Sequence, residues 1–158
     1  MSKFALGVRS RNNLNGVNPR LVAVVERAIQ ITNQDFLVLE GVRSKEKCWE
    51  NYGKGRTAAE CIAKSVPTKY AKPAEPKVTW LSNPLASKHC LQTDGTGHAV
   101  DLVPWPIDWS TLSKFDEIAR VMMQAAKTLN VSIRWGADWD RDGKPRERGE
   151  TDSPHFEI

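Results

Sequence analysis

Three side chains that can bind a metal ion lie in the second half of this sequence. His89 lies in a polar loop, Asp101 lies inside the apolar run Ala99-Val100-Asp101-Leu102-Val103, and His155 lies close to the last residue. Two imidazoles and one carboxylate are a typical ligand set for catalytic zinc, which keeps its fourth position open to water. Because zinc lowers the pKa of bound water to about 7, such a set predicts hydrolytic chemistry at neutral pH.

The alternation of side chains along a strand indicates which of these residues face each other. In a strand over 97–103, Asp101 and His98 point to opposite faces, and near the C-terminus His155 and Glu157 share one face. A buried carboxylate without a partner costs several kcal/mol or becomes neutral, so Asp101 requires a cation. His98 is therefore expected at the surface or in contact with the ligands, and it is not expected to bind the metal ion.

An acidic residue near the metal is required to accept the proton of the attacking water. Asp152 precedes His155 by three residues and is one candidate for this general base, and Glu157 on the His155 face is the other. Cys90 adjoins His89 and is an alternative metal ligand, although the side chains of successive residues diverge.

A second group of acidic residues resembles the start of a calcium-binding loop. Asp138, Asp140 and Asp142 form the DxDxDG pattern of an EF-hand. The twelfth position of such a loop, which should be glutamate, is Gly149, and Glu150 comes one residue late. A solvated acidic turn and a bound Ca²⁺ ion both remain open interpretations.

The elements that position these residues can be predicted from periodicity and from turn residues. Apolar residues at helical spacing predict amphipathic helices over 19–29 and 110–129. Shorter helices are expected over 44–53 and 57–64, and strands over 35–43, 97–103, 131–136 and 154–158. Four prolines indicate that 65–86 is an extended insertion. These elements predict an α+β fold, with helices at one side of a small, mainly antiparallel sheet.

Composition limits the class of protein. The 158 residues suffice for one domain, and the net charge of +4 favours an anionic partner such as a cell wall or nucleic acid. The positive residues are scattered, without the basic stripe of nucleic-acid binders, so we expect no nucleic-acid partner. No apolar run is long enough to span a membrane, and no secretory signal is evident. Three cysteines without a CxxC motif are expected to be free, buried thiols.

Several motifs resemble those of a known enzyme family. Ser87-Lys88-His89 followed by Gly97-His98-Ala99-Val100-Asp101 resembles the SxH…GxAxD signature of the LAS-type zinc peptidases. These include D-Ala-D-Ala carboxypeptidases and phage L-alanyl-D-glutamate endopeptidases. Asp152-Ser153-Pro154-His155-Phe156-Glu157 is similar to the second family motif, an acid followed by His-Phe-Glu. Glu40-Gly41-Val42-Arg43-Ser44 and Trp135-Gly136-Ala137-Asp138-Trp139 are similar to two further family segments.

The matches occur in family order and cover nearly the whole chain. One departure lies between His89 and Gly97, which are separated by seven residues where the family pattern has two. The arrangement of this 90–96 insertion is not evident from the sequence.

The resemblance implies roles for individual residues. It implies a Hedgehog/DD-peptidase-like fold and one Zn²⁺ ion bound by His89, Asp101 and His155, with Asp152 as catalytic base. It also implies that Arg43 stabilises the developing oxyanion or a substrate carboxylate, although Arg43 would equally suit an ion pair with a surface acid. Further candidates for contacts to the ligands or to substrate are Glu157, His98 and Trp139.

These expectations combine into one functional hypothesis. We expect residues 1–158 to form a single, monomeric catalytic domain, without a separate wall-binding domain, that cleaves the L-Ala-D-Glu bond of peptidoglycan stem peptides. As a phage endolysin it would be made in the host cytoplasm and would reach the wall through a holin-type lesion, without inserting into the membrane. The alternatives are a D-Ala-D-Ala carboxypeptidase and a non-catalytic binding module, in which a fourth protein ligand would close the zinc site.

Overall fold

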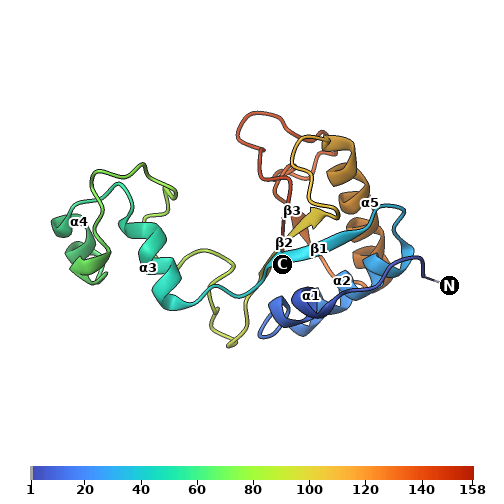
Figure 1. Ribbon diagram of the computed structural model, residues 1–158, viewed down its shortest axis with the longest axis horizontal. Coiled ribbons are helices and arrows are strands. Elements are labelled where there is room, and N and C mark those ends of the chain that lie inside the picture. The colour runs from blue at the N-terminus through green and yellow to red at the C-terminus, as the bar shows by residue number, and fades with distance from the viewer. Residues whose placement is uncertain (1) are drawn as a thin grey trace.

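The computed structural model describes residues 2–158, which form a four-stranded antiparallel sheet and its helices (Figure 1). The strands are β1 (Phe36–Glu40), β2 (Ala99–Pro104), β3 (Arg134–Trp135) and β4 (His155–Glu157), in the order β1-β2-β4-β3. The helices are α1 (Val8–Asn13), α2 (Pro19–Ile31), α3 (Lys45–Gly53), α4 (Ala58–Ala63) and α5 (Leu112–Thr128), and η1 (Thr68–Tyr70) is a 3₁₀ turn. The predicted α+β class is confirmed.

Helices α2 and α5 pack against one face of the sheet and enclose the main core. Asn18 caps α2 by accepting a hydrogen bond from the Arg20 amide, and Pro19 begins the helix. The core consists chiefly of Leu21, Val24, Val25, Ala28, Val38, Val100, Leu102, Ile118, Val121, Met122, Ala125 and Phe156. Burial of each large aliphatic side chain contributes about 1.5–3 kcal/mol to the free energy of folding. Because β2 and β4 turn Val100 and Phe156 into this core, their neighbours Asp101 and His155 face the opposite side.

Residues 45–86 form a separate lobe that projects from the sheet, with α3 and α4 at the left of Figure 1. The lobe has a small core of its own, built around Tyr52, Cys61 and Val66. The buried Arg56 guanidinium donates to the carbonyl oxygens of Tyr52, at 2.7 Å, and Thr79, at 2.9 Å. These bonds attach the extended segment around residue 79 to α3. Within this lobe, 65–86 contains only the short turn η1, as the prolines predicted.

The structure differs from the predicted elements at three main places, and one of them is the strand predicted over 35–43, which ends at Glu40. The helix α1 carries no side-chain cap and was not predicted. The strand predicted over 131–136 contains only Arg134–Trp135. The residues just before it form the C-terminal cap of α5 and so are not part of the strand. There Asn130 has a positive φ of 54°, and the Val131 amide donates to the Ala126 carbonyl.

The expectation of three free thiols was wrong for two of them. Cys48 in α3 and Cys90 form a disulfide across 42 residues of sequence, and Cys61 is the free, buried cysteine. The pairing arises because α3 docks against the chain segment that follows His89, which cysteine spacing alone does not reveal. In the part of the chain described, no helix combines the length and the apolar character needed to cross a bilayer.

Candidate active site

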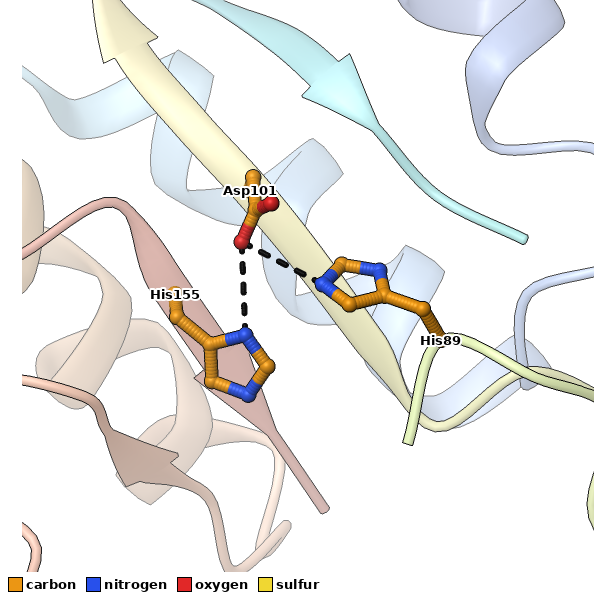
Figure 2. A group of neighbouring side chains, drawn as sticks. All are labelled: His89, Asp101 and His155. Carbon is orange, nitrogen blue, oxygen red and sulfur yellow. Dashed lines mark ion pairs between the residues drawn. The ribbon is translucent and has the colours of Figure 1, made fainter. Parts of the chain in front are cut away.

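His89, Asp101 and His155 converge on the face of the sheet opposite the main core. Asp101 on β2 and His155 on β4 are direct partners in the antiparallel register, so their side chains share a face. His89 reaches them from the loop before β2. Figure 2 shows both imidazole rings directed at one oxygen of Asp101: His89 Nε2 and His155 Nδ1 each lie 3.3 Å from Asp101 Oδ1.

The donor set fits a divalent metal ion. One ligand atom from each of the three residues lies within 4.8 Å of the others. Asp101 Oδ1 is buried and, despite the nearby imidazole nitrogens, accepts no hydrogen bond. An unsatisfied buried acceptor costs about 1–3 kcal/mol, and more when charged, whereas a cation between the carboxylate and the imidazoles would remove this cost.

Each imidazole is oriented by a contact on its other nitrogen. His89 Nδ1 lies 2.8 Å from the carbonyl oxygen of Gly41, which can only accept, so Nδ1 carries the proton and Nε2 faces Asp101. His155 Nε2 likewise donates to Glu157 Oε1 at 2.9 Å, which leaves Nδ1 for the metal site. Arg134 holds the other Glu157 oxygen at 3.1 Å. Such contacts orient ligands and raise their basicity.

Gly41 and Arg134 were not identified from the sequence. A Cβ atom at Gly41 would collide with the carbonyl oxygen of Asn13, so only glycine fits where this backbone approaches. Arg134 is the register partner of Glu157 across β3 and β4. Strand alternation could have indicated Arg134 if the pairing of β3 with β4 had been known.

The insertion at 90–96 folds into a compact turn that leaves His89 in place. The Gln92 amide donates to the Thr96 carbonyl at 2.8 Å, and Gly95 takes a positive φ of 79° at the turn. The His98 amide donates to the Lys88 carbonyl, which brings the residue before His89 alongside the start of β2. His98 itself pairs with Asp94 at 2.8 Å, so it lies outside the ligand set, as strand alternation predicted.

Asp152 lies beside the ligand set and is held there by the turn that follows β3. Its Oδ2 is 3.9 Å from His155 Nδ1. The Asp152 amide donates to the Gly136 carbonyl at 3.1 Å, and Trp135 Nε1 donates to the Ser153 carbonyl at 2.6 Å. A Cβ atom at Gly136 would collide with the Asp152 carbonyl oxygen. The Trp135-Gly136 turn therefore places the Asp152 backbone.

The electrostatics of the site favour a charged Asp101–His155 pair when no metal is bound. Burial alone would raise the pKa of Asp101, but the adjacent His155 and His89 hold it well below its usual range. Burial disfavours the charged form of His155, yet the Asp101 and Glu157 carboxylates raise its pKa to about 9. Partial desolvation raises the pKa of Asp152, with Asp101 adding to this effect and His155 opposing it.

His89, Asp101 and His155 open into a cleft of about 320 Å³ between the sheet and the lobe. Arg43, Asp101 and Asp152 line its sheet side, and the lobe side comprises Cys48, Asn51, Lys54, Val78, Thr79, Leu81 and Pro84. Arg43 Nε donates to Glu40 at 2.7 Å, and Nη1 lies 3.4 Å from Ser87 Oγ. Arg43 therefore forms the ion pair with a nearby acid and faces the cleft as well.

Trp139 lies against His155, with ring centroids 5.4 Å apart, and the Arg134 guanidinium covers its ring at 4.8 Å. Arg134, which also pairs with Glu157, thus contacts both neighbours of His155. Glu157 lies on the side of His155 away from Asp101, whereas Asp152 lines the cleft. This geometry favours Asp152 over Glu157 as the group that reaches a bound water.

The acidic loop brings together a different set from the one its pattern suggested. Carboxylate oxygens of Asp138, Asp140 and Glu150 lie within 4.8 Å of one another, whereas Asp142 groups with Asp140 and Glu147. Glu150 is 5% exposed, and its Oε1 has no hydrogen-bond partner. Glu150, which lies one residue beyond the twelfth position of the EF-hand pattern, is therefore close to Asp138 and Asp140 in the folded chain.

Comparisons with known proteins identify similar chains. The family model for phage L-alanyl-D-glutamate peptidases matches residues 1–74 and 63–158. The L-alanyl-D-glutamate peptidase of Escherichia phage T5 is 29% identical over 161 residues, which cover 98% of each chain. The crystal structure of the Serratia marcescens L-Ala D-Glu endopeptidase ChiX is similar with a TM-score of 0.62 and 26% identity, over 99% of this chain and 91% of that one.

Proposed function

The chain belongs to the phage L-alanyl-D-glutamate peptidase family, and we propose that it is a zinc-dependent endopeptidase that hydrolyses the L-Ala-D-Glu bond of peptidoglycan stem peptides. The observation that carries this proposal is the ligand triad His89, Asp101 and His155, which opens into a cleft beside Asp152. We propose these three residues as the zinc ligands. A bound zinc ion would supply Lewis acidity and a water molecule of lowered pKa.

The other residues of the cleft have roles in proton transfer and substrate binding. Asp152 accepts the proton of the attacking water and then delivers it to the leaving amine of D-Glu. Its raised pKa makes it a stronger proton acceptor than an ordinary aspartate. Arg43, fixed by Glu40, donates to the scissile carbonyl oxygen as negative charge develops there, or to a substrate carboxylate.

A structural zinc site is a weaker interpretation of the same geometry. It would require a fourth protein ligand, and Cys90 was the candidate adjacent to His89. Cys90 is bonded to Cys48 and so cannot bind the metal as a thiolate. Within the described residues the cluster at this face contains three ligands, which leaves a position for water.

The proposal is tested by incubating the zinc-loaded protein with purified peptidoglycan and identifying the fragments by mass spectrometry. We expect peptides with a new N-terminal D-Glu, and L-Ala left on the muramic acid. Release of free D-Ala would instead identify a carboxypeptidase. No fragments from a protein with zinc bound would favour a binding module.

We propose Ca²⁺ as a second bound ion, held by Asp138, Asp140 and Glu150. The unpartnered, buried Glu150 oxygen supports this site, since Ca²⁺ takes carboxylate oxygens as ligands. Asp142 contributes to the loop through its amide, which donates to Asp138 Oδ1 at 3.2 Å.

We also propose that residues 1–158 act as one monomeric catalytic domain. The two matched ranges of the family model together span the chain, which supports a single functional unit. We further propose synthesis in the host cytoplasm, followed by passage to the wall through a holin-type lesion.

A further inference from the structure

One face of helix α3 forms part of the cleft wall. Cys48, Asn51 and Lys54 follow one another at intervals of three residues, so they lie along one side of the helix, with Lys54 at its C-terminal cap. All three line the cleft. The disulfide joins Cys48 to Cys90, the residue after the metal ligand His89. The bond therefore holds this face of α3 towards the metal side of the cleft.

Lys54 brings a positive charge into the cleft, and among residues 2–158 its ammonium group has no ion-pair partner. It is partly buried, and the lysines that form ion pairs in the described chain are Lys47, Lys114 and Lys144. Arg43 is the other cation that lines the cleft, and its Nε is already occupied by Glu40. A partly desolvated ammonium group in a substrate cleft favours an anionic group of the ligand.

The chemistry of the stem peptide places its free anionic groups on one side of the scissile bond. On the L-Ala side the peptide is joined as an amide to the lactyl group of muramic acid, which leaves no free carboxylate. On the D-Glu side, the α-carboxylate of D-Glu and the side-chain carboxylate of a diaminopimelate residue are both free. A carboxylate subsite in the cleft therefore identifies the side that binds the leaving group.

We propose that Lys54, with Asn51 beside it, forms a carboxylate subsite for the D-Glu side of the stem peptide. This inference rests on the proposed function and extends it to substrate orientation. The leaving peptide lies along α3, the muramic acid lies away from it, and Lys54 distinguishes stem peptides by their charge. Binding energy gained at this subsite holds the scissile bond at the metal site.

The test measures kcat/KM on soluble muropeptides that differ by one carboxylate. One pair contains D-Glu or D-isoglutamine, and the other contains diaminopimelate or lysine at the third position. The wild type should prefer the carboxylate form of at least one pair by about 10- to 100-fold, the range expected for one charge-assisted hydrogen bond. In Lys54→Met this ratio should fall towards one, mainly through KM. The substrate pair between which Lys54→Met no longer discriminates identifies the carboxylate that Lys54 binds.

Lys64→Met is the matched control, because Lys64 is an exposed lysine of the same lobe outside the cleft. This control should retain the wild-type substrate ratio, and Lys54→Arg should restore most of the preference. A Lys54→Met variant with the wild-type ratios for both pairs would overturn the proposal. So would an equal loss of activity on all four substrates, which indicates a general effect on the lobe.

A binding measurement separates this inference from the proposed activity. The leaving peptide, D-Glu linked to diaminopimelate, is titrated calorimetrically into wild type and Lys54→Met. Weaker binding by about tenfold or more in the variant supports the subsite, even if no preparation cleaves peptidoglycan. Equal affinities of wild type and Lys54→Met for this peptide would overturn the subsite. Cleavage of peptidoglycan, measured separately, would still support the proposed function.

Discussion

Asp101 Oδ1 combines the two properties that mark a metal position: it lies 3.3 Å from two imidazole nitrogens and accepts a hydrogen bond from neither. The opposite nitrogens of these imidazoles donate to Gly41 and Glu157. These contacts keep a proton on the outward nitrogen of each ring and fix the ring's orientation, so a metal ion would displace only the proton on His155 Nδ1. At the residue scale, the site is prepared for a cation.

The first prediction concerns the general base. Asp152→Ala should retain one zinc ion per chain and lose about 10²- to 10⁴-fold in kcat, because proton transfer is removed while the ligands stay in place. Metal analysis and steady-state kinetics on the same preparation measure both quantities. His155→Ala should lose zinc as well as activity.

Glu157→Gln provides the comparison, since Glu157 contacts a ligand from outside the cleft. It should weaken zinc binding about 10- to 100-fold. Near wild-type activity in Asp152→Ala would refute the assignment of Asp152 as the base.

The second prediction concerns pH. The pKa of His155 is raised from 6.5 to about 9 in the folded protein. Stability from its ion pair is therefore fully present below about pH 6.5 and is lost as pH rises through 9. Zinc requires the neutral imidazole, so its apparent affinity should rise about tenfold per pH unit up to about pH 9.

Calorimetry at pH 7 in buffers of different ionisation enthalpy should detect the proton that zinc displaces from His155. Thermal unfolding of the zinc-free protein should show declining stability between pH 6.5 and 9. A zinc affinity that does not vary with pH in this range would contradict the assigned pair.

At the element scale, the site depends on strand register and on the attachment of one helix. The register of β2 with β4 places Asp101 opposite His155, and that of β3 with β4 places Arg134 opposite Glu157. The disulfide attaches α3 to the segment after His89. The sheet therefore positions two residues of the proposed ligand triad, and α3 supplies the facing wall of the cleft.

The third prediction concerns this attachment. Replacing Cys48 and Cys90 together by serine should lower the free energy of unfolding by about 2–4 kcal/mol, because a long loop is no longer closed in the unfolded chain. It should also raise KM, since the α3 wall is no longer held against the metal side. Chemical denaturation and muropeptide kinetics measure the two effects.

A phosphine reductant gives the matched comparison. It should reproduce both effects in the wild type and leave the double variant unchanged. A reductant effect of equal size in the double variant would show that the disulfide is not responsible.

The fourth prediction concerns the acidic loop. Ca²⁺ should raise the melting temperature of the wild type, because it binds the folded arrangement of Asp138, Asp140 and Glu150. Glu150→Gln should abolish the shift. Glu147→Gln is the control, since Glu147 belongs to the other acidic group, whose three residues are all exposed. If Glu147→Gln alone removed the shift, the ion would bind at that second group.

At the scale of the whole molecule, the cleft lies between two parts that have separate hydrophobic cores, the sheet with its helices and the 45–86 lobe. The sheet and its helices share the main core, and the lobe packs around Tyr52, Cys61 and Val66. Within the lobe, Arg56 joins the extended segment at Thr79 to the end of α3, and that segment lines the cleft. The cleft wall thus depends on a buried arginine as well as on the disulfide.

The fifth prediction concerns net charge. The chain carries +4, and peptidoglycan carries free carboxylates, so initial association with the wall should weaken as salt increases. Sedimentation of the protein with purified walls at 0.05 and 0.5 M salt measures this binding. Neutral muropeptides should show little salt dependence in KM. Wall binding that does not vary with salt would exclude a contribution from net charge.

The sequence was sufficient for the features that depend on local pattern. Helical spacing predicted α2 and α5, and strand alternation correctly separated Asp101 from His98 and grouped His155 with Glu157. The order of the motifs indicated the family that the family model matches. These inferences succeed because side-chain direction in a regular element follows from its period alone.

Tertiary structure decided the features in which distant segments meet. The Cys48–Cys90 bond, the Gly41 carbonyl behind His89 and the approach of Glu150 to Asp138 each join residues whose contact no local period encodes. The same is true of Lys54, whose sequence neighbours give no sign that it faces a metal site. Such contacts follow from how the lobe and loops pack on the sheet, a property of the folded chain as a whole.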